Sequence, residues 1–384
     1  MNVASSWARE LKISSSELST TAYLPNVLSN LNALHESIDR MFRRFRLDQP
    51  PNARAWVNGG QRYTINDGLI HLAQEAHMAL PTRLAKAAGS EKYCVTLNGL
   101  SAWDPWFALE TQRLMLNPLF EELGGGPAAG VDFYTFFGNY GFTPFGVHDD
   151  IDHSLLWHLG PHSKIAYVWP RAAYVELTGG ELSTLDYESL ISHARRYELR
   201  PGDLLFIPKG DFHVLQTASF SCTLGLTIFP DDLLTECSEG LRLMGLTSAD
   251  DPMMNAPLTL HDLAMLRRLA VESNGFVITP PNRCDSLEFD CEAMGRISLS
   301  SSSFWPLRTV RVGDRQALLV RGKVIWARTN PVFNVLCELL AGGRCLPFEA
   351  VRDQLKGQIN ERALIELITV IARMGGVSLQ THDS

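Results

Sequence analysis

A histidine and an aspartate two residues apart, His148 and Asp150, have the types and spacing to bind one metal ion. Side chains at positions i and i+2 of a β-strand point to the same face, so both can converge on one site, whereas Asp149 points the other way. The motif LRPGDLLFIPKGDFHVL, residues 199–215, offers His213 as the third ligand. One carboxylate and two imidazoles leave open positions on an octahedral ion, an arrangement typical of non-haem Fe(II) oxygenases.

A lysine that follows this pair meets a second requirement of such chemistry. Residues 159–162, Leu-Gly-Pro-His, are expected to form a hairpin turn, and Lys164 then begins the returning strand. Lys164 shares one face of that strand with Ala166 and Val168, which are small. An enzyme that uses 2-oxoglutarate leaves one carboxylate of this cosubstrate inside the protein, and burying it unpaired is very costly. Lys164 is therefore the expected partner of that carboxylate.

These motifs resemble the JmjC branch of the cupin-fold 2-oxoglutarate oxygenases, and in particular the bacterial ribosomal-oxygenase-like hydroxylases. The resemblance rests on the H-x-D pair, the apolar strand and glycine turn after it, a basic residue, and the string PGDLLFIPKGDFH. It covers residues 131–230 at the level of motifs and continues to the C-terminus at the level of architecture. It implies an α+β fold whose core is a double-stranded β-helix, the jelly roll of the cupins.

The resemblance also implies an activity and a set of site residues. The activity is hydroxylation of a side chain in a protein or peptide, with Fe(II) as cofactor, 2-oxoglutarate and O2 as cosubstrates, and succinate and CO2 as products. Because Asp150 is present, no iron position is vacated for a halide, so hydroxylation is favoured over halogenation. The implied residues are His148, Asp150 and His213 as catalytic iron ligands, Lys164 as the binder of the cosubstrate carboxylate, and Thr143 and Ser154 as further cosubstrate contacts.

The other polar residues near the H-x-D pair are expected to have structural roles. His153 has the wrong strand parity for the site, and His162 lies in the turn. His158 has the right parity but lies far along the strand, which favours a core or substrate-pocket position. Asp152 is expected to cap the turn after Asp150 rather than to reach the substrate. The aromatic residues expected to pack in the core are Trp157, Tyr167, Trp169, Tyr134 and Phe136, of which the last two could instead line a cavity.

Other functions remain open. The same oxygenase chemistry could act on a small molecule or a carrier-bound amino acid. N-methyl demethylation is chemically similar, but the sequence assigns no aromatic cage for a methylammonium group. A different class is a non-catalytic cupin sensor joined to a winged-helix regulator. Lys164 together with a complete metal triad favours the enzyme, because a sensor needs neither an open iron face nor a buried partner for a carboxylate.

Short β-rich runs separated by turn residues position these side chains. They lie within residues 92–231, the expected catalytic barrel, and no helix separates each pair. This pattern indicates an antiparallel barrel or jelly roll. The expected strands are 93–97, 131–137, 154–158, 164–169, 203–208 and 223–229.

Helices are expected before this barrel. Residues 1–91 are predicted to be a mainly helical region that wraps the barrel. Apolar residues recur at spacings of three and four over residues 31–45, which predicts an amphipathic helix with an arginine-rich, solvated face. A second apolar helix is expected over residues 67–86.

Two further regions are expected after the barrel. Residues 232–303 are predicted to be a helical segment that ends in a serine-rich linker at residues 298–303. The resemblance implies that this segment serves in dimerisation, so a homodimer is expected. Residues 304–384 are predicted to form a winged-helix-like domain in which Asn360 caps the third helix. The tail has eleven Lys or Arg and seven Asp or Glu from Ser301 onward. This surplus is small for a helix that reads DNA, which favours substrate docking or assembly.

Composition limits the partners of the chain. It has 384 residues, 45% of them hydrophobic, and a formal net charge of −8. The negative charge argues against a nucleic-acid partner, and no apolar run approaches the length of a membrane span. The seven cysteines are an odd number without a CxxC pair, and no apolar leader begins the chain. We therefore expect free thiols and a cytoplasmic location.

Overall fold

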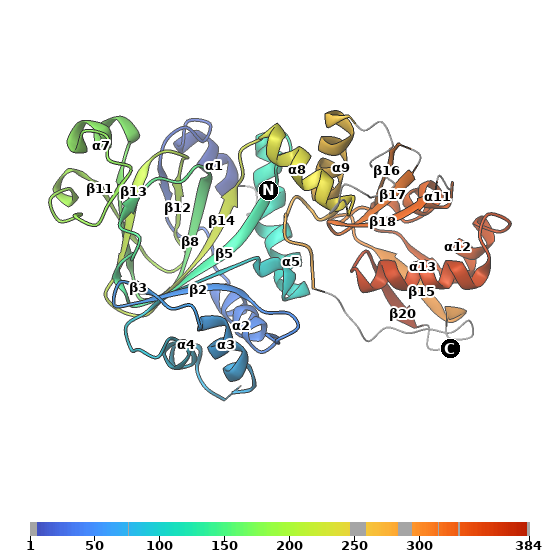
Figure 1. Cartoon of the computed structure of the whole chain (residues 1–384), viewed down its shortest axis with the longest axis horizontal. Coiled ribbons are helices and arrows are strands. Elements are labelled where there is room, and N and C mark those ends of the chain that lie inside the picture. Colours follow the sequence, from blue (N-terminus) through green and yellow to red (C-terminus); the bar gives the residue numbers. More distant parts are fainter. Residues whose placement is uncertain are drawn as a thin grey trace. The chain divides into compact units, whose positions relative to one another are not determined.

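The computed structural model of the chain contains two units (Figure 1). The first comprises residues 1–125 and 131–230, and the second comprises residues 126–130 and 231–384. Among the described helices, none is both long and apolar enough to cross a membrane. Cys284 and Cys291 lie outside the described residues, and the other five cysteines are free thiols. The structure describes residues 6–75, 77–245, 259–282, 294–313, 315–328 and 331–381.

An eight-stranded sheet forms one side of the first unit. Its strand order is β1-β12-β8-β14-β5-β4-β2-β3, and each neighbouring pair is antiparallel. Five of the six strands expected from the sequence are confirmed here, as β4, β5, β8, β12 and β14. The bounds are β1 Ala22–Leu24, β2 Asn52–Val57, β3 Gly60–Gln61, β4 Cys94–Asn98, β5 Val131–Gly138, β8 His153–Pro161, β12 Leu204–Ile207 and β14 Ser221–Ile228.

A six-stranded antiparallel sheet forms the other side. Its order is β10-β7-β13-β9-β11, and β6 pairs with β13 beside this path. The sixth expected strand is confirmed here as β9. Consecutive strands from β7 to β9, and again from β11 to β14, alternate between the two sheets. The bounds are β6 Gly141–Phe142, β7 Val147–His148, β9 Lys164–Trp169, β10 Ser183–Thr184, β11 Arg195–Leu199 and β13 Phe212–Thr217.

Strand alternation sorts the apolar residues between the interior and the outer faces of the sheets. Ala166 and Val168 of β9 pack with Leu156 of β8 and Leu205 of β12, so they lie between the two sheets. On the outer face of the six-stranded sheet, a second cluster covers β9 and β13 and includes helix α7 (Arg171–Thr178). The aromatic residues expected to pack do so: Tyr167 and Trp169 lie in this second cluster, and Trp157 packs edge-on against Trp7.

The turn at residues 159–162 is not a hairpin, and that expectation was wrong. Strand β8 pairs with β12 and β14, whereas β9 pairs with β11 and β13. The turn therefore carries the chain from one sheet to the other. The sequence pattern, two apolar runs separated by a glycine turn, does not distinguish a hairpin from a crossing between packed sheets. Both faces of each strand are buried here, so the strands are apolar throughout in either case.

The N-terminal region combines helices with strands. The amphipathic helix is confirmed as α2 (Leu31–Phe42), whose Leu34, Ile38 and Met41 are buried. The helix expected over 67–86 is instead split into α3 (Ile65–His71) and α4 (Leu80–Ala88). Pro81 lies at the start of α4, where its fixed φ and missing N–H suit a helix beginning rather than an interior. The remaining helices of this unit are α1 Ser6–Ser14, α5 Pro105–Thr111 and α6 Asn117–Leu123.

Strands β1, β2 and β3 also lie in this region, which the sequence pattern presents as mainly helical. Strand β2 reads Asn-Ala-Arg-Ala-Trp-Val, and its alanines, Ala53 and Ala55, are buried while Arg54 between them is exposed. The alternation is real, but alanine has a low strand propensity and a small apolar side chain, so the pattern is faint. Pairing of β2 with β4 extends the eight-stranded sheet over one side of the cavity described below.

The second unit begins with two packed helices, α8 (Leu233–Leu243) and α9 (Leu260–Ser273). A three-stranded sheet, order β16-β17-β18, packs its inner residues against them in one apolar cluster. A second cluster brings together helices α11, α12 and α13 with the sheet β19-β15-β20. The bounds are β15 Ile297–Ser301, β16 Arg308–Val312, β17 Arg315–Val320, β18 Lys323–Arg328, α11 Pro331–Leu339, β19 Cys345–Pro347, α12 Phe348–Gln354, α13 Glu361–Arg373 and β20 Val377–Thr381.

Two local expectations for this unit have definite outcomes. Asn360 caps α13, because its side-chain oxygen accepts a hydrogen bond from the backbone N–H of Ala363 at 2.8 Å. The linker expected at residues 298–303 is wrong, since β15 is the central strand of its sheet and Leu299 is fully buried. Serines are small enough to alternate with apolar residues in a buried strand, so composition alone suggested a linker.

Candidate metal centre and its cavity

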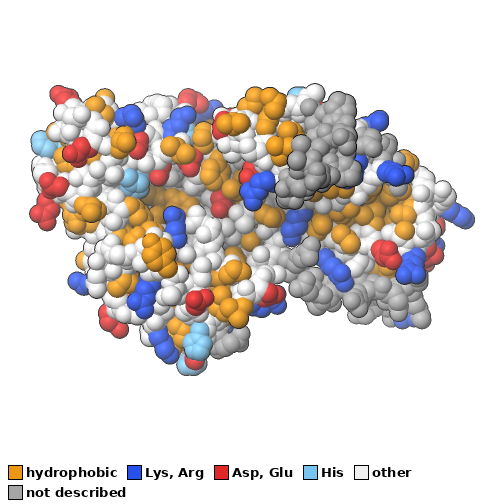
Figure 2. All heavy atoms as spheres, in the orientation of Figure 1, with side chains coloured by type: hydrophobic (Ala, Val, Ile, Leu, Met, Phe, Trp, Pro, Cys, Tyr) orange, Lys and Arg blue, Asp and Glu red, His pale blue; other side chains and the backbone are white. Residues whose placement is uncertain are grey.

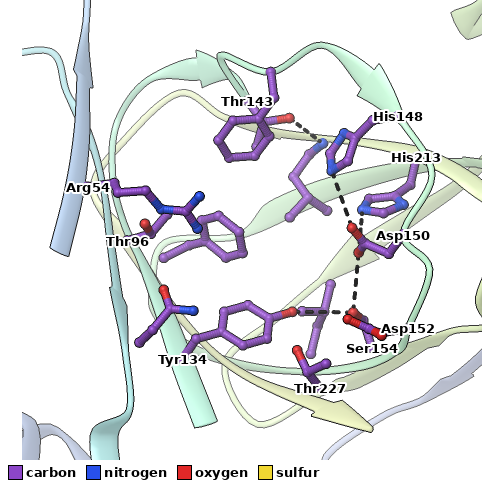
Figure 3. Close-up of a pocket in the computed structure, with 15 residues that line it drawn as sticks. Arg54, Thr96, Tyr134, Thr143, His148, Asp150, Asp152, Ser154, His213 and Thr227 are labelled. Atoms are coloured by element: carbon purple, nitrogen blue, oxygen red, sulfur yellow. Dashed lines mark hydrogen bonds and ion pairs between the residues drawn. The ribbon is translucent and has the colours of Figure 1, made fainter. Parts of the chain in front are cut away.

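Three potential metal ligands meet between the two sheets. His148 ends β7 and is paired in register with His213 of β13, while Asp150 follows β7 directly. The Nε2 atoms of His148 and His213 lie 4.0 and 3.7 Å from the two carboxylate oxygens of Asp150. One ligand atom from each residue lies within 4.8 Å of the others (Figure 3). An ion about 2 Å from each donor fits between them.

Backbone carbonyls orient both imidazole rings. The Nδ1 atom of His148 lies 3.0 Å from the carbonyl oxygen of Gly146, and that of His213 lies 3.3 Å from the carbonyl oxygen of Asp211. A carbonyl can only accept, so each Nδ1 carries the proton and each Nε2 offers a lone pair toward Asp150. This use of the second ring nitrogen is typical of metal-binding histidines. Burial, and then the neighbouring His148, lower the pKa of His213 to about 4, which keeps it neutral as a ligand must be.

A glycine is required where the chain enters β7. Gly146 has φ +69°, and a Cβ atom there would lie 2.2 Å from the carbonyl oxygen of Thr184. The backbone of β10 therefore closes directly over Gly146, and any side chain would push the two strands apart. The Gly146 carbonyl also orients His148. A change in the pairing of β7 with β10 would therefore also move the ring of this potential metal ligand.

Lys164 is a fully buried cation without a counter-charge. Its Nζ atom has no hydrogen-bond partner in the described part of the chain, and the rings of Tyr140 and Phe136 lie 5.6 and 6.0 Å away. Burial lowers the pKa of Lys164 from 10.5 to about 8. The Tyr140 hydroxyl is also buried without a partner. Two unsatisfied donors at one end of the interior suit an anion.

The cavity at the metal centre has a volume of about 400 Å³. Thr143 and Ser154 both line it, and so do Tyr134 and Phe136. Lys164 is not among the lining residues, and its Nζ atom lies 6.0 Å from the centre of the Phe136 ring. The lining residues are Arg54, Thr96, Asn98, Tyr134, Phe136, Thr143, Phe145, His148, Asp150, Asp152, Ser154, Leu156, His213, Leu215 and Thr227.

Hydrogen bonds hold two of these residues in place. The Ser154 hydroxyl donates to Oδ2 of Asp150 at 3.4 Å and accepts from the Tyr134 hydroxyl at 3.4 Å. Ser154 therefore fixes the carboxylate of a potential metal ligand. The Thr143 hydroxyl accepts from the backbone N–H of Leu215 at 3.3 Å, which fixes Thr143 against β13 in the wall of the cavity.

Asp152 faces the cavity, so the expectation that it caps a turn was wrong. Its Oδ1 atom is buried and has no hydrogen-bond partner among the described residues. Burial, and then the charge of Asp150, raise the pKa of Asp152. Strand parity extends from Asp150 to Asp152 even though the chain between them is not a regular strand, and this parity was the signal that would have placed the side chain inward.

His153 and His158 lie outside the group of three potential metal ligands. The backbone N–H of Lys209 donates to Nδ1 of His153 at 3.2 Å, outside the site. His158 is fully buried between the Thr223 hydroxyl and the His162 carbonyl oxygen, and burial lowers its pKa to about 4. His158 is therefore a neutral core residue, as its position along the strand indicated.

Three lining residues had no signal in the sequence. Arg54 comes from β2, and Thr96 and Asn98 come from β4. They reach the cavity only because β2 and β4 join β5, a pairing between segments about 40 residues apart. No motif marks such a pairing in a single sequence.

No protein-family model and no curated protein matches the sequence. Solved structures do match. The ribosomal oxygenase YcfD from Escherichia coli has a TM-score of 0.49 and 13% identity, over 97% of this chain and 98% of that chain. YcfD in complex with cobalt and 2-oxoglutarate matches at a TM-score of 0.47 and 14% identity, over 94% of both chains. The non-haem alpha-ketoglutarate-dependent carbocyclase SnoK from nogalamycin biosynthesis matches at a TM-score of 0.37 and 13% identity, over 58% of this chain and 84% of that chain.

The chain is similar to a ribosomal oxygenase. At these identities and TM-scores the similarity assigns no function, which rests instead on the side chains of the cavity.

Proposed function

We propose that the first unit is an Fe(II)- and 2-oxoglutarate-dependent dioxygenase that hydroxylates a C–H bond of its substrate. One observation carries this proposal. Ligand atoms of His148, Asp150 and His213 lie within 4.8 Å of one another, and the buried, unpaired Lys164 lies on β9, the strand that pairs with the strand of His213. The donor set suits Fe(II) and would leave three positions of an octahedral ion open.

The buried Lys164 and Tyr140 fit a carboxylate of 2-oxoglutarate. A carboxylate placed between Lys164 and the Tyr140 hydroxyl would satisfy two buried donors that otherwise have no partner. Because Phe136 lines the cavity and Lys164 does not, binding in this position requires side chains between the cavity and the lysine amine to move. Thr143, in the wall on the same side of the cavity, is the proposed third contact of the cosubstrate.

Bound iron and 2-oxoglutarate would supply the oxidising chemistry, with O2 consumed and succinate and CO2 released. The chain supplies position and environment. Ser154 and Tyr134 hold the Asp150 carboxylate, and the carbonyls behind His148 and His213 hold the rings. The apolar side chains in the cavity wall limit the water that surrounds the reacting atoms. They are Phe136, Phe145, Leu156 and Leu215.

The proposed substrate group is a side chain of a protein or peptide. The cavity volume of about 400 Å³ is near the lower end for ligand pockets, and the cosubstrate must share it. The space that remains suits a group of side-chain size, which a small molecule or a carrier-bound amino acid could also present. Lys and Arg side chains are scattered among Asp and Glu over the face in Figure 2, which does not favour nucleic acid as the substrate.

We also propose that the paired sheets form a double-stranded β-helix of the cupin type. The alternation of consecutive strands between the two sheets supports this architecture. For residues 304–384 we propose a winged-helix-like domain, supported by α11, α12 and α13 and by strand β20 after the third helix. A role of α8 in dimerisation is supported by its exposed leucines, Leu233, Leu234 and Leu241. The free thiols are compatible with a cytoplasmic location.

Anaerobic titration tests the proposed function. Fe(II) is added to the metal-free protein, followed by 2-oxoglutarate, and both affinities are measured by calorimetry and visible absorption. We expect one Fe(II) per chain, and 2-oxoglutarate binding that depends on the metal. His148→Ala should abolish both, whereas His193→Ala, a change on the surface, should alter neither. If 2-oxoglutarate binds equally with and without Fe(II), or does not bind, the site is not that of a 2-oxoglutarate oxygenase and the sensor function is favoured.

A further inference from the structure

A cationic side chain lies across the cavity from the metal ligands. Arg54 of β2 is paired with Thr96 of β4, and Thr96 is paired with Phe136 of β5. The three side chains share the inner face of the sheet and all line the cavity. In Figure 3 the Arg54 guanidinium points into the cavity beside Thr96, with His148, Asp150 and His213 on the opposite side.

The Arg54 guanidinium has no counter-charge within the described residues. None of the ion pairs or hydrogen bonds of the described chain includes it, and the centre of the Trp56 ring lies 5.8 Å from the guanidinium carbon. Several other arginines of this unit have a carboxylate partner, as Arg40 has in Asp104 at 2.8 Å. An arginine at the edge of a cavity is thus left with all its donors available.

Thr96 provides an independent indication of a ligand at this place. Its side chain is 2% exposed, and its hydroxyl is buried without a hydrogen-bond partner among the described residues. Leaving a buried hydroxyl unsatisfied is unfavourable, and most such groups in folded proteins have a partner. The next inward residue on β4, Asn98, also lines the cavity. A guanidinium, a buried hydroxyl and an amide therefore face the same space.

Asp152 lines the end of the cavity opposite Arg54, near the metal ligands but not among them. Its Oδ1 atom is buried and has no hydrogen-bond partner among the described residues. A bound divalent cation would offset the charge of Asp150 but would not use Asp152 as a ligand. An anionic group would be repelled by Asp152 and attracted by Arg54, so the two ends orient a ligand in one direction. The planar guanidinium matches the geometry of carboxylate and phosphate oxygens, with which it forms paired hydrogen bonds.

We propose that Arg54 and Thr96 form a substrate-recognition subsite for an oxyanion, a carboxylate or a phosphate, on the group to be hydroxylated. Anchoring that oxyanion at Arg54 directs the remainder of the substrate toward the metal centre. The subsite selects acidic substrates over neutral and basic ones. The statement that the anchored group is hydroxylated rests on the proposed function, whereas binding of the oxyanion at Arg54 does not.

A binding measurement tests the subsite without turnover. The protein is loaded with Zn²⁺ and saturated with N-oxalylglycine, an unreactive analogue of 2-oxoglutarate, so that the probes cannot occupy the cosubstrate position. The probes are N-acetylglutamate, N-acetyl-O-phosphoserine, N-acetylglutamine and N-acetyl-lysine amide, and their affinities are measured by calorimetry. The two anionic probes distinguish a carboxylate from a phosphate preference. We expect one of them to bind at least about tenfold more tightly than the neutral and basic probes.

Variants assign that binding to Arg54. Arg54→Gln should weaken the preferred anion at least about tenfold, and Arg54→Lys should restore part of the loss because it keeps the charge without the planar fork. Thr96→Val, which has the same shape, should weaken the anion less than Arg54→Gln does. Arg196→Gln is the matched control, since Arg196 is an arginine of β11 outside the cavity and lies 3.4 Å from Glu198. It should leave all affinities unchanged.

Three results would overturn the proposal. The first is that neither anionic probe binds more tightly than the neutral probe. The second is that Arg54→Gln binds the anionic probes with the same affinity as the unmodified protein. The third is that Arg54→Gln loses affinity for N-oxalylglycine instead, which would assign Arg54 to the cosubstrate. Failure of the proposed function looks different. In that case the protein shows no Fe(II)-dependent 2-oxoglutarate binding, yet the anionic probes, tested without N-oxalylglycine, still bind in a manner that depends on Arg54.

Discussion

Replacement of Lys164 by methionine should stabilise the metal-free protein and remove 2-oxoglutarate binding. Lys164 is fully buried and its amine has no partner in the described chain, so folding transfers an uncompensated cation from water to the interior. Burial lowers its pKa from 10.5 to about 8. At about 1.4 kcal/mol for each unit of pKa, this difference corresponds to about 3 kcal/mol of lost folding free energy at neutral pH.

The sign of the pH dependence follows from the same lowering. Between about pH 8 and pH 10.5 the unfolded chain keeps the proton on Lys164 and the folded chain loses it. Unfolding then takes up a proton, so the contribution of Lys164 makes the free energy of unfolding rise with pH over that interval. Lys164→Met, which is similar in volume, should be more stable than the unmodified protein by about 3 kcal/mol below pH 8. The advantage should disappear above pH 10.5.

The assay is urea denaturation of the metal-free protein at several pH values, with 2-oxoglutarate affinity measured on the Fe(II)-loaded protein. The buried cation that destabilises the metal-free chain is the group that should bind the cosubstrate. Lys164→Met should therefore lower the affinity for 2-oxoglutarate at least about 100-fold, as expected when one member of a buried charge pair is removed. Lys209→Met, which changes an exposed lysine, is the control for both measurements. A variant that is less stable below pH 8 and binds 2-oxoglutarate normally would refute the reasoning.

Three other changes test separate parts of the structure. Gly146→Ala should weaken Co²⁺ binding, measured by visible absorption, because a Cβ atom would lie 2.2 Å from the Thr184 carbonyl oxygen; unaltered affinity would show that β7 tolerates displacement. Ser154→Ala removes the hydroxyl that donates to Asp150 and should lower the affinity for Co²⁺ about tenfold. Ser154→Thr keeps a hydroxyl and should recover that affinity. Asn360→Ala removes the cap of α13 and should lower the free energy of unfolding of the second unit by about 1 kcal/mol, measured by denaturation, without changing Co²⁺ affinity.

The convergence of His148, Asp150 and His213 could be predicted from sequence because it depends largely on local geometry. His148 and Asp150 lie two residues apart, so strand parity alone places them on one face. His213 follows the short turns of a recognisable motif, and Lys164 begins a strand whose inward residues are small. In each case a residue's direction follows from the few residues around it, and the fold then has only to bring two faces together.

The part of the cavity opposite the metal could not be predicted in this way. Arg54 and Thr96 face inward only because β2 and β4 extend the sheet beyond β5. The alanines on either side of Arg54 give β2 too weak a strand pattern to separate it from a helix. Asp152 was misassigned for a different reason, because the strand parity of Asp150 was not extended to the next position of the same parity, which would have placed Asp152 inward. In the structure its Oδ1 atom is buried without a hydrogen-bond partner among the described residues.

Release of CO2 from carboxyl-labelled 2-oxoglutarate is the most direct test of the central claim. The purified chain is incubated in air with Fe(II), ascorbate and the labelled cosubstrate, and labelled CO2 and succinate are measured together. We expect equal amounts of CO2 and succinate, and we expect their formation to require Fe(II). Neither product should form with His148→Ala or Lys164→Met. If CO2 is released equally by the unmodified protein and by these variants, or by none of them across peptide, small-molecule and acidic substrates, the chain is not a 2-oxoglutarate oxygenase.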